Sequence, residues 1–162
     1  MSSLLIAAFI LTALTLFLII FFKTNAGVMF LAACTGFVLL GSIDPTVITA
    51  AGAVVPSEGE AYIRLTVVLL SMIFAALLFK NTVKGMHLVF HIGIGLVLSL
   101  VLVLMLPETT GVSWLLDYVT DPVWSDVNEF RSLIIAAGFG MSLIAIMTTT
   151  KKVHRKDKKS KH

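Results

Sequence analysis

The chain has 162 residues, of which 58% are hydrophobic and 13% are charged, and its mean hydropathy is +1.02. Water-soluble domains usually carry about a quarter charged residues, so this composition excludes an ordinary soluble globular domain. The net charge of +3 does not indicate nucleic-acid binding, because most of the positive charge lies in the C-terminal segment. A single cysteine excludes an intramolecular disulfide.

Apolar stretches long enough to cross a membrane make up most of the chain. A spanning helix needs about 20 apolar residues, because the hydrocarbon core is about 30 Å thick and each helical residue rises about 1.5 Å. The sequence therefore predicts an all-α integral membrane protein, a five-helix transmembrane bundle, formed by one domain over residues 1–150. The expected spans are residues 4–22, 27–43, 63–79, 86–106 and 131–150.

Two Asp-Pro pairs indicate further helix starts. Asp as the N-cap followed by Pro at the first helical position is typical of a helix N-terminus. Asp44-Pro45 predicts a short helix after the second span, over residues 45–53, which either lies on the outer face or re-enters the membrane. Asp121-Pro122 predicts that the last helix begins well before its apolar part.

The segment 107–130 is the longest connection. Pro107 is expected to end the fourth span. Ser113 is expected to cap a short interfacial helix that carries Trp114 and Tyr118, because such amphipathic aromatic side chains favour the membrane interface.

Basic residues gather on one side of this arrangement. Ten of the twelve Lys and Arg residues lie in the turns after the first and third spans and in the tail at 151–162, whereas eight of the nine acids lie on the other side. Cytoplasmic loops carry an excess of Lys and Arg. We therefore expect a bacterial cytoplasmic membrane protein with its N-terminus outside and its C-terminus in the cytoplasm. The tail has no apolar periodicity and is expected to be disordered.

Polar residues in or next to the spans are candidates for a transport pathway. His87 and His91 lie four residues apart on the fourth span, and Gly95 and Ser99 continue the same helix face. Either His87 lies at the cytoplasmic interface and His91 forms a hydrogen bond across a helix contact, or both line a proton or ion path. Two histidines at this spacing can also bind a metal ion, but no third ligand can be assigned, so no metal site is expected. Asp44 is either an N-cap or a cation ligand at a broken helix.

Small residues four apart form the clearest pattern, because they let helix backbones approach closely in lipid. They serve either packing within the bundle or a subunit interface. These helix-packing candidates are Ala32, Gly36, Gly93, Gly95, Ala136, Gly138, Gly140 and Ser142.

The basic tail is a second candidate surface. It either binds anionic lipid headgroups, at about 1 kcal/mol per basic residue, or contacts an acidic partner, or only determines topology. Its candidate residues are Lys151, Lys152, Arg155, Lys156, Lys158 and Lys159.

No catalytic or phosphate-binding motif is present in the sequence, so neither enzymatic activity nor a cofactor is expected. The apolar runs also lack the midplane carboxylate that ion-coupled transporters usually carry. The sequence favours a small membrane protein that acts through assembly, as a homo-oligomer or as a structural subunit of a membrane complex. Its expected partners are membrane lipids and other membrane subunits. The alternative is an oligomeric channel or carrier for a small solute or ion.

Overall fold

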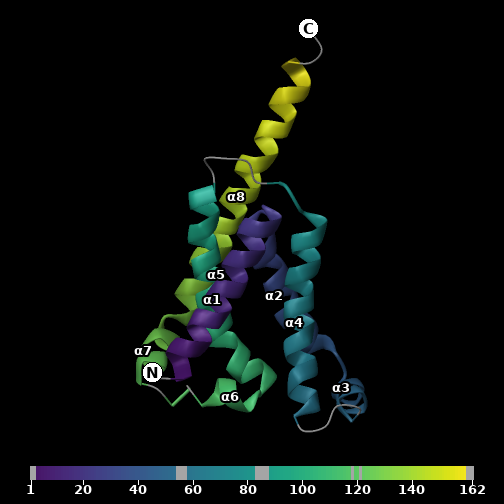
Figure 1. The fold of residues 1–162 in the computed structure, drawn as a ribbon, viewed down its shortest axis with the longest axis vertical. Helices are drawn as coiled ribbons and strands as arrows, with labels where there is room; N and C mark the ends of the chain where they lie inside the picture. Colours follow the sequence, from purple (N-terminus) through teal and green to yellow (C-terminus); the bar gives the residue numbers. More distant parts are fainter. Residues whose placement is uncertain (1–2, 54–57, 83–87, 118, 121, 160–162) are drawn as a thin grey trace.

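The computed structural model describes residues 3–53, 58–82, 88–117, 119–120 and 122–159, and its regular structure there is entirely helical. Long helices run side by side along the long axis, and short helices gather at the end where the N-terminus lies (Figure 1). The long helices are α1 (Ser3–Phe22), α2 (Ala26–Ser42), α4 (Gly59–Leu78), α5 (Leu88–Thr110) and α8 (Arg131–Lys159). The short helices are α3 (Pro45–Gly52), α6 (Ser113–Leu116) and α7 (Pro122–Glu129).

The helical membrane class predicted from the sequence agrees with the lengths and composition of these helices. Within the described residues, α1, α4, α5 and α8 are each long and apolar enough to cross a membrane. Helix α2 meets the same test only together with α3, across a bend of 97°. The chain therefore has four candidate spans, or five when the bent pair is counted as one span.

The bend between α2 and α3 follows from the Asp-Pro pair. Asp44 accepts hydrogen bonds at Oδ1 from the Thr46 N–H (2.9 Å) and from Thr46 Oγ1 (2.7 Å), and Pro45 is the first residue of α3. The new helix then packs on the start of α4. A Cβ atom at Gly52 would lie only 2.8 Å from the Glu60 nitrogen, so this contact requires glycine.

Helix α5 does not end at Pro107, as the sequence predicted, but continues to Thr110. The missing proline N–H costs one hydrogen bond in the last turns. Two other carbonyls in the last turns also accept from threonine hydroxyls, the Thr109 Oγ1–Met105 O and Thr110 Oγ1–Leu106 O distances being 2.7 and 2.6 Å. Gly111, with φ of +72°, ends the helix, and its N–H donates to Pro107 O.

Two further boundaries differ from the prediction. The last helix does not begin at the second Asp-Pro pair, because α7 ends at Glu129 and a turn at Phe130 separates it from α8. Ser113 is the first residue of α6 and not its cap. Glu58 supplies the missing acceptor, since its Oε2 lies 3.3 Å from the Ser113 nitrogen.

The tail that was expected to be disordered continues α8 as a helix to Lys159, beyond the end of the bundle (Figure 1). No Gly or Pro interrupts the sequence between Met141 and Lys159. Lys and Arg are good helix formers, so the hydrogen-bond ladder of the span can propagate into the tail.

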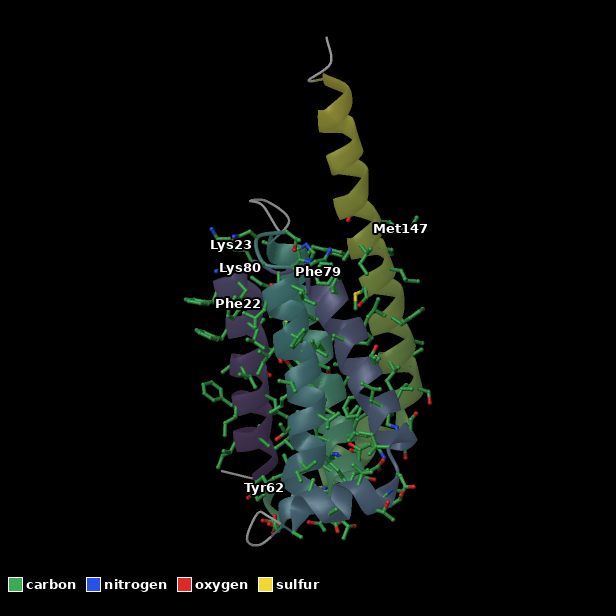
Figure 2. The ribbon with its side chains drawn as sticks, turned by 90° about the vertical axis from the view of Figure 1, so that its right-hand side faces the viewer. Phe22, Lys23, Tyr62, Phe79, Lys80 and Met147 are labelled. Atoms are coloured by element: carbon green, nitrogen blue, oxygen red, sulfur yellow. The ribbon has the colours of Figure 1, made fainter. Side chains whose placement is uncertain are left out.

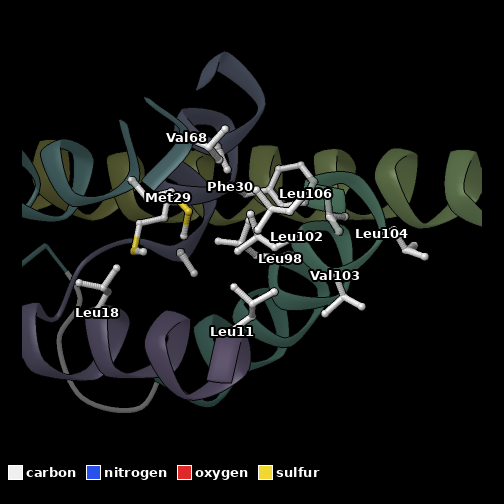
Figure 3. Close-up of a cluster of buried hydrophobic side chains, with 14 of the residues drawn as sticks. Leu11, Leu18, Met29, Phe30, Val68, Leu98, Leu102, Val103, Leu104 and Leu106 are labelled. Carbon is white, nitrogen blue, oxygen red and sulfur yellow. The ribbon is translucent and has the colours of Figure 1, made fainter. Parts of the chain in front are cut away.

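The core lies where α1, α2, α4 and α8 surround α5, the most buried of the candidate spans. Phe30, Leu98 and Leu102 are fully buried there (Figure 3). Glycine allows the closest approaches. A Cβ atom at Gly95 would lie 2.6 Å from Ile19 on α1. Tight small-residue contacts of this kind are how helices associate in lipid, where the hydrophobic effect gives little help.

The two ends of the bundle differ in charge. Lys23 and Lys80 lie together at one end, whereas Tyr62 lies at the other (Figure 2). At this second end Glu108, in the last turns of α5, forms an ion pair with Arg131 at the start of α8. We call these the basic end and the acidic end. The described basic turns therefore lie at one end of the bundle and the acidic connections at the other, as the sequence predicted.

Candidate functional site

The polar stripe of α5 faces the protein interior. His87 lies outside the described residues. His91 is 3% exposed and Ser99 is 2% exposed. Gly95, between them on the same face, packs on α1. Ser99 Oγ donates to the Gly95 carbonyl at 2.8 Å, so its polarity is satisfied within its own helix. The described part of this face is a packed helix contact.

Asp44 lies at the acidic end and is exposed. The hydrogen bonds from the Thr46 hydroxyl and then from the Thr46 N–H hold the pKa of Asp44 below its ordinary value. The role of Asp44 as the N-cap of α3 explains both hydrogen bonds. Within the described part of the chain, no group of three or more His, Cys, Asp or Glu residues lies close enough to hold a metal ion.

Several of the predicted small residues form tight contacts within the bundle. The Ser71 hydroxyl donates to Ala32 O at 2.9 Å, and a Cβ atom at Gly36 would clash with that hydroxyl. On α8, Gly138 lies against the ring of Phe30, where a Cβ atom would approach to 2.4 Å. Ser142 is fully buried.

The remaining small residues lie on open surfaces. Ala136 is exposed, and a Cβ atom at Gly140 or at Gly93 would meet nothing within 4 Å. Ser132, four residues before Ala136, is also exposed. At 100° per residue, these α8 positions lie on the side opposite Gly138. Helix α8 therefore has one face of small residues turned toward the bundle and a second turned away from it. We call Ser132, Ala136 and Gly140 the outer α8 face.

The candidate tail residues, from Lys151 to Lys159, belong to the part of α8 that extends past the basic end (Figure 1). They lie at the same end as Lys23 and Lys80 (Figure 2). The positive charge of this end is therefore contributed by two turns and one helix.

The turn between α1 and α2, at the basic end, was predicted, but the burial of its polar residues Thr24 and Asn25 and their hydrogen bonds were not. Thr24 Oγ1 donates to Ala76 O (3.0 Å), one of the terminal carbonyls of α4. Asn25 caps α2, because its Oδ1 accepts from the Gly27 N–H at 2.9 Å. The amide of Asn25 also lies 3.5 Å from Ala145 O on α8. An Asn directly before a helical apolar run is a capping signal that the sequence contained.

The turn after α4 completes this arrangement. The Asn25 N–H donates to Thr82 Oγ1 at 3.0 Å, and that hydroxyl donates to Phe79 O at 2.8 Å. In return, the Asn81 N–H donates to Phe22 O, the terminal carbonyl of α1, at 2.9 Å. The two turns thus satisfy each other's backbone groups. These contacts link α1, α2, α4 and α8 at the basic end.

A groove between α1, α5 and α7 was also missed. Its volume of about 360 Å³ is within the range of small-molecule sites. Trp124 is 8% exposed, and its Nε1 is buried without an acceptor in the described part of the chain. Leu5, Leu96 and Val123 are about half exposed, so the groove opens at the bundle surface. Its lining is Leu5, Ala8, Thr12, Leu96, Ser99, Leu100, Val103, Leu104, Val123, Trp124 and Val127. Only the tertiary placement of α7 brings these residues together.

A more open polar recess of about 420 Å³ lies at the acidic end. Arg64 there has a buried Nε without a hydrogen-bond acceptor among the described residues. Glu58, the cap of α4, and Glu60, in its first turn, line the same recess. The recess is lined by Glu58, Gly59, Glu60, Ala61, Arg64, Thr110 and Gly111.

Comparisons with known proteins found no match to this chain. No protein-family model matches the chain, and neither curated proteins nor solved structures give a significant match.

Proposed function

We propose that the protein acts through assembly in the membrane, as a homo-oligomer or as a structural subunit of a larger membrane complex. The observation that carries this proposal is the outer α8 face. Small residues repeat on it at every fourth position, yet Ser132 and Ala136 are exposed, and a Cβ atom at Gly140 would meet no described atom within 4 Å. On the opposite face of the same helix, glycine is used for close contact with a neighbouring ring. The outer face fits the same kind of contact with a second copy of α8.

Several features of α8 support this role. Its apolar part, Arg131–Thr148, is only 17% buried within one chain, the lowest value among the candidate spans. Small residues at every fourth position let two helices approach closely in lipid. A two-fold contact through this face would bring each residue of the face near its own copy. The proposed orientation places the basic end in the cytoplasm, because Lys and Arg concentrate there.

Disulfide cross-linking in native membranes tests the proposal. In a Cys34→Ser background, we expect Ala136→Cys and Gly140→Cys to give disulfide-linked dimers on mild oxidation. Leu70→Cys is the matched control, because Leu70 is 53% exposed on α4 and away from the outer α8 face. Cross-linking of both α8 variants but not of the control supports assembly through α8. Monomers at all positions, together with monomeric behaviour in mild detergents, would overturn it.

The channel or carrier alternative has no comparable support. It requires polar groups along a path, and the described part of the α5 stripe is buried against α1. Flux measurements in liposomes provide the direct check, since a pathway along this face would be lost in His91→Ala.

A further inference from the structure

We propose that the groove between α1, α5 and α7 binds one acyl chain of a membrane glycerolipid, with the ester carbonyl of that chain accepting a hydrogen bond from Trp124 Nε1. This site is separate from the proposed assembly surface. Its lining comes from α1, α5 and α7 and includes no residue of α8. Lipid binding and self-association can therefore fail independently of each other.

The chemistry of the lining selects an uncharged, apolar occupant. None of its residues is charged, and its polar members are Thr12, Ser99 and Trp124. The hydroxyl of Ser99 is already bonded within α5. Such walls suit hydrocarbon, and they contain no cationic side chain to pair with the carboxylate of a free fatty acid or with an anionic headgroup. By contrast, the recess around Arg64 is polar and belongs to a different part of the acidic end.

The indole of Trp124 indicates where the ester end of the bound acyl chain lies. A buried N–H without an acceptor is unfavourable, and hydrocarbon contains no water to supply one. Tryptophan is enriched at the membrane–water interface, the depth at which its N–H can meet polar groups of lipids. Trp124 lies on α7, one of the short helices at the acidic end of the bundle (Figure 1). An ester carbonyl at this depth accepts the hydrogen bond, and its chain continues inward between α1 and α5, toward Leu96 and Ser99.

A comparison of two lipids on the unaltered protein tests the hydrogen bond. The full chain is purified in detergent, stripped of lipid, and titrated with diacyl or with dialkyl-ether phosphatidylcholine, with bound lipid counted by native mass spectrometry. We expect one saturable lipid per chain. The ether lipid lacks the carbonyl and should bind about two- to tenfold more weakly, the effect of one lost hydrogen bond. In Trp124→Phe the two lipids should bind equally.

A matched pair of variants tests the groove itself. Ala8→Phe places a ring inside the lining, whereas Ala13→Phe places the same ring on an exposed position of α1 outside it. We expect at least tenfold weaker lipid binding in Ala8→Phe and no change in Ala13→Phe, with both variants monodisperse and equally helical. Absence of saturable binding, equal binding of ester and ether lipids by the unaltered protein, equal effects of the two Phe variants, or displacement of the lipid by equimolar oleate would each overturn the proposal.

Discussion

Asn25 shows how one polar residue organises the basic end. It is 3% exposed, it caps α2, and it lies in a turn that contacts α4 and α8. Replacing a capping Asn by Ala costs about 0.5–2 kcal/mol. We expect Asn25→Ala to lower the free energy of unfolding in detergent by about this amount, as measured by denaturant titration. Asn25→Ser keeps a capping oxygen and should recover most of the loss. Equal stability of all three proteins would contradict a capping role.

Asp44 gives a prediction about pH. Its native pKa is lowered, first by the Thr46 hydroxyl and then by the Thr46 N–H. The unfolded state therefore binds the proton more tightly. The stabilising effect of this cap is complete above the unfolded pKa, about 3.9 for Asp, and is lost as pH falls through the native pKa. NMR titration of the Asp44 carboxyl should show this lowered value. Thr46→Val should move the pKa upward, and an unchanged value would assign the shift to another cause.

At the scale of helices, α8 offers a comparison between its two faces. Gly138→Leu would force a large side chain into the ring of Phe30. We expect it to lower the free energy of unfolding by about 1–3 kcal/mol, the usual effect of overpacking. Gly140→Leu meets open space and should leave the folded monomer as stable as before while weakening self-association. Analytical ultracentrifugation and denaturant titration separate the two effects. Destabilisation of the monomer by both variants would contradict the assignment of faces.

The helices themselves were largely predictable from sequence, because the length of an apolar run is set by the thickness of the membrane. Their ends were less so. Pro107 is a stop signal in sequence, but α5 continues past it to Thr110 and ends at Gly111, which adopts the αL conformation. For Trp124, no pattern in the sequence indicates a binding groove. Its place in a groove depends on how α7 packs near α1 and α5, which periodicity along one helix cannot indicate.

For the whole molecule, the separation of charge predicts an orientation. Lys23 lies at the basic end and Glu58 lines the polar recess at the acidic end, and both residues are exposed. In a Cys34→Ser background, a membrane-impermeant maleimide applied to intact cells should label Glu58→Cys and not Lys23→Cys. Permeabilised cells should label both, which controls for reactivity. The reverse pattern in intact cells would invert the orientation.

The contact between the α1–α2 turn and α8 has a consequence for biosynthesis. A Cβ atom at Gly27 would lie 2.6 Å from Ser142 O, and the Asn25 amide reaches Ala145 O, 120 residues later in the chain. During translation, the first hairpin therefore leaves the ribosome long before its final partner exists. We infer that the nascent chain cannot reach its native packing until the last helix has been inserted. A stop codon ahead of α8 should then yield a product that cellular proteases remove.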